Sequence, residues 1–283
     1  MRLFWVIPVA ALFVLNGCAT IGDSIGRKFG QQLSGGILNH DDPETVAEGL
    51  PAYLLLLDGL NRGAKPSVER LCLAAELYSA YAGSFVADPA RAQRLSQRSF
   101  DYAERALCAA RPQDCGLRER PFDQVGVAAA AWQARDVALG YCYGAAWAGW
   151  IQTHAEDWSA IAAIPKARAA LERVVALDPA HGGGQVQLYL GVMNSLLPPA
   201  VGGKPEIAKA YFDEALQRSG GRNQMVRVLY ARHYARLVFD QELHDRLLAE
   251  VLAADPQAPD LTLINALARR QAEALQVSGK DYF

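Results

Sequence analysis

Residues Leu197 to Leu216 read LPPAVGGKPEIAKAYFDEAL. Whether this stretch is a binding loop or only a turn decides whether the chain is interpreted as an enzyme or as a helical scaffold. Gly202-Gly203-Lys204 could be taken for a loop that holds a phosphate, but the stretch lacks the upstream glycine and the following serine or threonine of a P-loop. Pro205 also removes a backbone donor that such a loop would use. Because proline and glycine end one helix and open the next, the stretch predicts a lengthened turn between two helices.

The packing face of the helix after this turn recurs along the chain. A small residue is followed by a bulky one after four residues, by another small one after three more, and by a proline or glycine five residues later. Three segments show this spacing, with His244 in the first small position of the last: Ala167, Leu171, Val174 and Pro179; Ala208, Phe212, Ala215 and Gly220; His244, Leu248, Val251 and Pro256. This pattern is typical of the second helix of a tetratricopeptide repeat. Leu190-Gly191 would let the partner helix approach closely, and the periods of 41 and 36 residues predict degenerate repeats with insertions.

The chain from Asp41 onward has the pattern of successive helices. Asp42-Pro43 and Asp88-Pro89 combine a capping side chain with a proline in the first turn, where its missing N–H costs nothing. Apolar residues then recur at steps of three and four, and no alternating run predicts a strand. We therefore expect an all-α fold of stacked antiparallel helical hairpins, tetratricopeptide-like, in a single domain over residues 43–283.

The N-terminus has the features of an export signal. Arg2 precedes an apolar run of about thirteen residues, which is shorter than a membrane-spanning helix. Leu15-Asn16-Gly17-Cys18 resembles the lipobox of bacterial lipoproteins, with Cys18 as the lipidated residue. An ordinary secretory signal with an unrelated cysteine is the alternative.

From the lipobox we expect residues 1–17 to be the signal peptide and residues 18–42 a lipidated tether. Ala19 follows the cysteine, and the lack of an acidic retention residue there favours the outer membrane. The predicted location is thus the periplasmic face of the outer membrane, with contact to the bilayer made by acyl chains.

Export would place the other cysteines in an oxidising compartment. Cys108 and Cys115 flank a segment in which a helix must end before Pro112, so the chain can turn back and join them in a disulfide. Cys72 and Cys142 lie in apolar helical stretches, where buried thiols and a second bridge fit equally. No cysteine or histidine spacing is typical of a metal site, so we expect neither metal nor cofactor.

Charge and motifs argue against nucleic-acid binding and against catalysis. The net charge is −2 over 28 basic and 30 acidic residues, without the basic cluster that phosphate binding needs. His181 to Gly184 read HGGG, like an oxyanion loop, but the chain lacks the G-x-S-x-G motif that accompanies it. No acid–base pair or nucleophile with a base has a suitable spacing, so an enzyme is not expected.

Two sets of side chains remain as candidates for ligand binding. The first is an aromatic stripe at helical steps of four and three: Tyr143, Trp147 and Trp150. Core packing and the wall of an apolar cavity are both open interpretations of it. The second set pairs tyrosines and arginines one turn apart: Tyr230, Tyr234, Arg232 and Arg236. It fits a solvated basic face or a site for a carboxylate or phosphate head group.

The sequence as a whole resembles the T-component of tripartite ATP-independent periplasmic (TRAP) transporters, the TatT lipoprotein family. The likeness covers most of the chain after Glu48 and is most specific in LYLGVMNSLLPPAVGGKPEIAKAYFDEAL and YARHYARLVFDQELHDRLLAEVLAADP. The sequence departs from the family at His244, where a bulky aromatic is usual, and at Tyr143, where tryptophan is common.

The resemblance implies an accessory lipoprotein that assists a periplasmic solute-binding protein and holds an apolar or amphipathic small molecule. It also implies that the protein can form a homo-oligomer. Stacked helical hairpins form concave surfaces suited to binding. Two alternatives stay open at this point: a lipid or sterol carrier of another envelope transport system, and a ligand-free scaffold for protein interactions.

Overall fold

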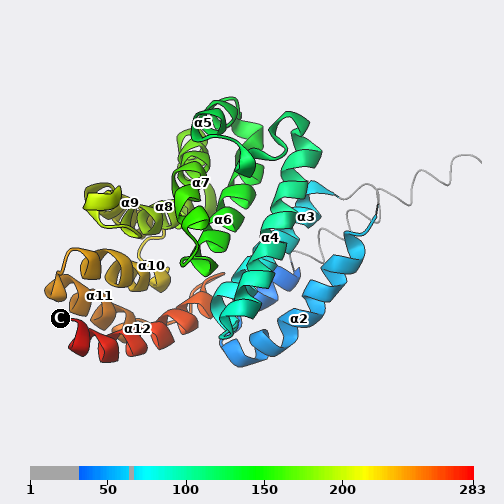
Figure 1. The fold of residues 1–283 in the computed structure, drawn as a ribbon. Helices are drawn as coiled ribbons and strands as arrows, with labels where there is room; N and C mark the ends of the chain where they lie inside the picture. Colours follow the sequence, from blue (N-terminus) through cyan, green and yellow to red (C-terminus); the bar gives the residue numbers. More distant parts are fainter. Residues whose placement is uncertain (1–31, 64–66) are drawn as a thin grey trace, which may run out of the picture.

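A computed structural model describes residues 32–63 and 67–283 of the chain. The predicted signal peptide, Cys18 and the first part of the tether lie outside the described residues. Within the described ranges the structure is built from helices and contains no strand, which confirms the predicted all-α class (Figure 1). No described helix is both long and apolar enough to cross a membrane.

The helices begin and end close to the capping, proline and glycine residues of the sequence. Residues 32–38 are helical. The main helices that follow are α2 (Pro43–Leu60), α3 (Val68–Phe85), α4 (Pro89–Ala110), α5 (Phe122–Ala130), α6 (Val137–Thr153), α7 (Trp158–Leu177), α8 (Gln185–Ser195), α9 (Pro205–Arg218), α10 (Gln224–Leu229), α11 (Gln241–Ala253) and α12 (Thr262–Tyr282). As predicted, the Asp42 and Asp88 side chains cap α2 and α4 by accepting from backbone N–H groups.

Short irregular helices connect or extend these elements. Helix α10 continues directly as a π-helix, η7 (Tyr230–Ala235). Between α4 and α5 lie the 3-10 turns η2 (Pro112–Asp114) and η3 (Leu117–Glu119), and η5 (His181–Gly184) joins α7 to α8.

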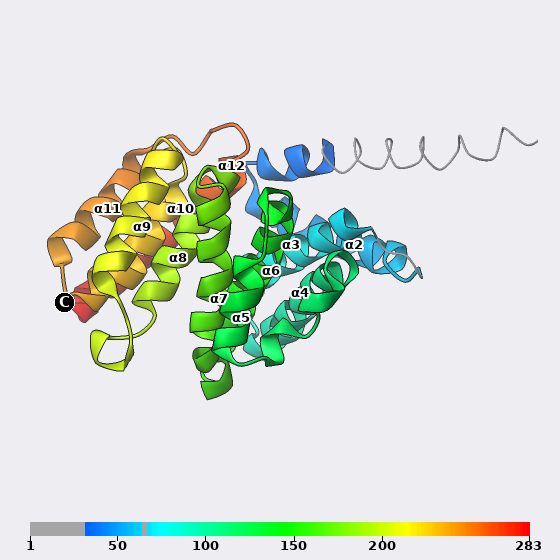
Figure 2. The same cartoon turned by 90° about the horizontal axis from the view of Figure 1, so that it is seen from above.

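The same packing arrangement repeats along the chain. In each case the two helices of a hairpin contact each other, and both contact the first helix of the next hairpin: α3 and α4 pack on α6, α6 and α7 on α8, α8 and α9 on η7, and α10 and α11 on α12. The first helices (α3, α6, α8, α10 with η7, and α12) thus form one layer, which we call the inner layer, and the second helices form an outer layer (Figure 2). The assignment of these pairs to tetratricopeptide repeats stays a prediction.

A bulky side chain of the outer layer meets a glycine of the inner layer in two successive hairpins. A Cβ atom added to Gly191 would lie 3.1 Å from ring atoms of Phe212, and one added to Gly144 would lie 2.6 Å from Cδ2 of Leu171. Phe212 and Leu171 have no exposed surface. The sequence pointed to Gly191, whereas the equivalent role of Gly144 became visible only in the structure.

His244 is accommodated in the last hairpin by another glycine. The imidazole is completely buried, and a Cβ atom on Gly279 of α12 would lie 2.8 Å from its Cε1 atom. The ring also makes an edge contact with Phe283 at a centroid distance of 5.1 Å. The chain therefore accepts histidine here because α12 leaves room for the ring.

The two ends of the described chain meet and close the stack. The Asn39 side chain donates to Oδ1 of Asp260 at 3.0 Å and accepts from the Asp260 backbone N–H at 2.7 Å. Arg270 of α12 forms a two-point ion pair with Glu44 at the start of α2. Figure 2 shows the N-terminal helical segment beside the loop that enters α12. These contacts turn a row of hairpins into a closed arrangement around the inner layer.

The loop between α8 and α9 is a turn held by its own backbone. Gly202 has φ of 99°, a left-handed conformation that favours glycine. The N–H groups of Gly203 and Lys204 donate to the carbonyls of Pro198 at 3.1 Å and Asn194 at 2.9 Å. These donors are used within the turn rather than directed at a phosphate.

We expect Gly203→Ala to destabilise the fold, because the added Cβ would lie 1.7 Å from the Leu197 carbonyl oxygen. The loss should be about 1–3 kcal/mol in urea unfolding followed by circular dichroism. Gly126→Ala is the matched control: that glycine lies within α5 with open space around it, so the change should stabilise by roughly 0.5–1 kcal/mol. Equal effects of the two substitutions would contradict the steric role of Gly203.

Candidate functional site

The aromatic stripe of α6 lies in the core. Tyr143 and Trp147 have no exposed surface and Trp150 has 8%. Phe100 of α4 lies against all three rings, at centroid distances of 5.4, 5.8 and 6.4 Å respectively. The ring faces are therefore engaged in packing α4 against α6, and a role for them in ligand binding stays a prediction.

The polar atoms of this stripe are not all satisfied. Trp150 Nε1 donates to Oε1 of Gln97 at 2.8 Å, but the hydroxyl of Tyr143 and Nε1 of Trp147 are buried and have no hydrogen-bond partner among the described residues. Burial, together with the neighbouring Glu104 carboxylate, raises the pKa of the Tyr143 hydroxyl well above its ordinary value. The hydroxyl therefore stays protonated at all physiological pH values.

The second predicted set lies away from the stripe, on the π-helix η7 and, for Arg236, on the residue that directly follows it. Tyr230 stacks on Phe212 with ring centroids 4.7 Å apart, and its hydroxyl lies 3.2 Å from Oδ1 of Asp213. Tyr234 contacts the Tyr230 ring edge-on at 5.3 Å. Tyr230 therefore attaches η7 to α9, and Tyr234 packs against the Tyr230 ring.

Arg232 of η7 and Arg236, which directly follows this helix, have different surroundings. Arg236 donates to the Leu275 carbonyl at 3.2 Å and to Oγ of Ser278 at 2.7 Å, and its guanidinium lies 4.8 Å from the centre of the Tyr282 ring. Arg232 makes no hydrogen bond or ion pair with any described residue, although it is half-buried. Burial and the charge of Arg236 lower its pKa. Since π-helical turns are frequent at functional sites, Arg232 is the member of the pair with donors left for a ligand.

Tyr141 and Tyr189 form an aromatic wall on the inner layer, and neither belongs to the stripe predicted from the sequence. Tyr141 of α6 and Tyr189 of α8 have ring centroids 6.4 Å apart, and the Tyr141 hydroxyl lies 2.6 Å from Oε1 of Gln185. Both residues keep part of their surface open to solvent. Burial nevertheless raises the pKa of Tyr141 well above its usual range and that of Tyr189 to about 12.

Glu76 of α3 lies near this wall. Its side chain is exposed, yet desolvation raises the pKa of its carboxyl, and its charge acts on both tyrosines. We call Glu76, Tyr141 and Tyr189 the inner wall.

Two hollows lie outside the inner wall, along α4. One, of about 370 Å³, is lined by Asp58, Asn61, Arg62, Arg98, Asp101, Tyr102 and Arg105. The other, of about 220 Å³, is lined by Phe100, Asp101, Glu104, Gly116, Arg118 and Glu119. In the larger one, the Asp58 carboxylate already accepts from two tyrosine hydroxyls and an arginine. The larger hollow is polar, unlike the apolar cavity that the sequence left open beside the stripe, and the smaller one combines charged side chains with apolar surface.

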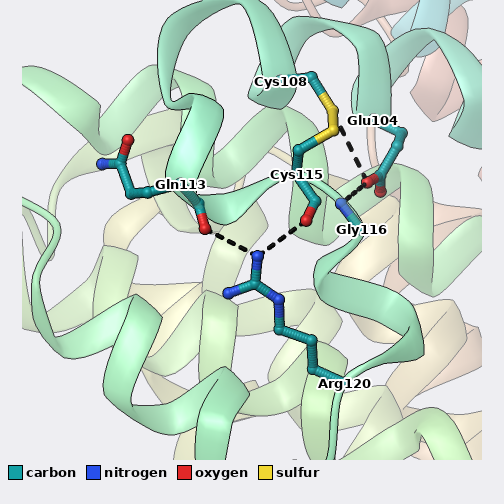
Figure 3. The surroundings of a disulfide bond; sticks show 6 residues. All are labelled: Glu104, Cys108, Gln113, Cys115, Gly116 and Arg120. Carbon is teal, nitrogen blue, oxygen red and sulfur yellow. Dashed lines mark hydrogen bonds between the residues drawn. A yellow bond between two sulfur atoms is a disulfide. The ribbon is translucent and has the colours of Figure 1, made fainter.

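The structure contains two disulfides. Cys108 and Cys115 are joined, as the sequence predicted, with Cα atoms 4.5 Å apart. The pairing that the sequence left open is a second bridge, Cys72–Cys142, which ties α3 to α6 within the inner layer. Figure 3 shows the first bridge with Glu104, whose Oε1 accepts from the Gly116 N–H at 2.6 Å.

Comparison with known families identifies the family of this chain. The sequence model of the TRAP transporter T-component matches residues 39–283, which include every helix from α2 to α12. The chain belongs to this family. A search of curated proteins found no match. The T-component described here therefore has a role with a TRAP transport system, as the resemblance in the sequence implied.

In this T-component, Trp147→Ala should remove a completely buried ring and leave a cavity between α4 and α6. We expect a loss of about 3–5 kcal/mol in the free energy of unfolding. Trp158→Ala is the control, because that ring is 81% exposed at the start of α7 and its loss should cost less than about 0.5 kcal/mol. Chemical denaturation of both variants gives the comparison, and a Trp147 variant as stable as the Trp158 variant would contradict the packing.

His233 gives the fold a specific pH dependence. Burial and the charge of Arg232 lower its pKa from 6.5 to about 4. The unfolded chain therefore binds the proton first, so this contribution to stability is complete above pH 6.5 and is lost as the pH falls towards 4. The loss should reach about 2–3 kcal/mol, and His233→Gln should remove that part of the slope between pH 7 and pH 4.5. An unchanged slope in denaturant unfolding would contradict the assignment.

Proposed function

We propose that this T-component is a lipid-anchored accessory protein at the periplasmic face of the outer membrane. In this proposal it binds a hydrophobic or amphipathic small molecule and passes it to the periplasmic solute-binding protein of its TRAP system. Family membership supports the transport role, and the inner wall is the observation that supports ligand binding. Acylation of Cys18 would supply the membrane anchor.

The inner wall suits an apolar chain better than the buried stripe does. Tyr141 and Tyr189 are half-buried neighbours, so part of their ring surface is accessible. Ligand sites commonly combine such aromatic surface with a few polar groups that fix orientation. Glu76 and the Tyr189 hydroxyl are polar groups of this kind.

An anionic head group fits the same layer. Arg232 lies on η7, which packs against α8 and so continues the layer that carries Tyr189. Its guanidinium has no protein partner among the described residues, and guanidinium groups pair well with carboxylate and phosphate oxygens. An amphipathic ligand would place its chain on the aromatic surface and its acidic head at Arg232.

Binding without chemistry is part of the proposal. The HGGG segment forms η5, in which Gly182, Gly183 and Gly184 all have positive φ, and it serves as the connection from α7 to α8. No catalytic role follows from that geometry. The protein acts as a carrier in this account, not as an enzyme.

A ligand-free scaffold is the second candidate function. The complete burial of Tyr143 and Trp147 favours it, because those rings leave no room for a ligand between them. The exposed leucines of α2, Leu55, Leu56 and Leu60, offer an apolar surface on which copies of the chain could associate. Homo-oligomerisation is compatible with either candidate.

A pair of ligands with the same chain length tests the carrier proposal. The full chain should bind a long-chain fatty acid, and Arg232→Ala should weaken that binding by about tenfold, the loss of one charged hydrogen bond. Binding of the corresponding fatty alcohol should change little, because it lacks the anionic head. Arg246→Ala, at an exposed arginine of α11, should leave both affinities unchanged.

Isothermal titration of the delipidated protein measures these affinities. If neither ligand binds, the scaffold becomes the better account. If both bind and Arg232→Ala affects them equally, the carrier role stands but the head-group site at Arg232 is wrong.

A further inference from the structure

The Cys108–Cys115 bridge lies beside a carboxylate in a geometry typical of metal ligands. One oxygen of Glu104 and the two sulfur atoms all lie within 4.8 Å of one another. The ligand atoms around a tetrahedral zinc ion are about 3.5–4 Å apart, so small shifts of these side chains would complete a set of two sulfurs and one oxygen. While the two sulfur atoms are bonded to each other in the disulfide, they are not available as thiolate ligands for a metal ion.

The local structure holds the three residues together without the disulfide. Glu104 and Cys108 are one turn apart on α4 and share a face. The guanidinium of Arg120 donates to the carbonyls of Gln113 at 2.7 Å and Cys115 at 2.8 Å, which fastens the loop that carries the second cysteine (Figure 3). The Gly116 N–H holds Oε1 of Glu104 at 2.6 Å. The ligand residues would therefore stay close after reduction.

The surroundings favour a cation and leave space for one. Oε2 of Glu104 is buried and accepts no hydrogen bond from a described residue, although the Tyr143 hydroxyl, which also has no partner, is a neighbour of this carboxylate. A buried carboxylate oxygen without a partner is costly. The hollow of about 220 Å³ next to it is lined by three carboxylates, those of Asp101, Glu104 and Glu119, and by a single arginine. It has room for water as a fourth ligand.

The two bridges of the protein differ in accessibility. Cys115 is exposed and Cys108 is half-buried, whereas in the other bridge Cys72 is half-buried and Cys142 is only 1% exposed, so the exposed sulfur belongs to the first bridge. Thiol–disulfide exchange requires access of the attacking thiolate to a sulfur atom. A reductant would therefore open Cys108–Cys115 first.

We propose that Glu104, Cys108 and Cys115 form a redox-gated site for a thiophilic divalent cation such as Zn²⁺ or Cd²⁺. A dithiol reductant transfers two electrons and two protons: its own sulfurs form a disulfide, the Cys108–Cys115 bond breaks, and both cysteines become thiols. The cation then displaces the two thiol protons, binds both thiolates and the Glu104 carboxylate, and keeps its charge of +2. The proposal is independent of the ligand carried on the inner layer.

Cadmium titration of the full chain after mild reduction and removal of the reductant tests this site. Two titratable thiols should appear, and Cd²⁺ should then give a sulfur-to-metal charge-transfer band that saturates at one ion per chain. The oxidised protein should give no band. Cys72→Ala/Cys142→Ala should retain the band, and Cys108→Ser/Cys115→Ser should lose it.

The carboxylate ligand is tested by a matched pair of variants. Glu104→Gln should lower the affinity for Cd²⁺ by about tenfold or more, whereas Glu119→Gln, which neutralises another carboxylate of the same hollow, should lower it much less. The proposal is overturned if the reduced protein with two free thiols binds no Cd²⁺, or if Glu104→Gln and Glu119→Gln have the same affinity. Circular dichroism of each variant establishes that it is folded.

Discussion

The close contact between a bulky outer-layer side chain and an inner-layer glycine sets the geometry of this protein. Leu171 meets Gly144 and Phe212 meets Gly191, so α6 and α7, and α8 and α9, approach to the distance of a side chain against bare backbone. Each hairpin also packs on the first helix of the next hairpin. The distance between the two helices of one hairpin therefore affects where the next hairpin lies. The position of Tyr141 relative to Tyr189, and hence the inner wall, depends on it.

The closure of the stack is of a different physical kind. It includes an ion pair between exposed side chains of α2 and α12 and an amide–carboxylate contact between Asn39 and the loop before α12. Exposed ion pairs contribute only about 0–1 kcal/mol each, so this ion pair adds little to the stability that the apolar core provides.

The sequence predicted the features that depend on local spacing. The Ala208, Phe212 and Ala215 face and the proline and glycine turn before it identified a helical hairpin, and the family resemblance rested on the same residues. The inner wall could not be found in this way. Tyr141 is two residues from Tyr143 and so faces a different side of α6, and only the packing of α6 on α8 brings it near Tyr189. Likewise, Arg232 and Arg236 look equivalent in sequence, but Arg236 meets α12 about forty residues later in the chain.

The central claim is that the inner layer of this T-component binds an apolar or amphipathic molecule. Photo-crosslinking with a diazirine-bearing fatty acid, followed by mass spectrometry of the peptides, tests it most directly. The account predicts labels on the α6 and α8 peptides that contain Tyr141 and Tyr189, and their loss when unlabelled fatty acid competes. Labels confined to the exposed leucines of α2, or labels that competitor does not reduce, would contradict it.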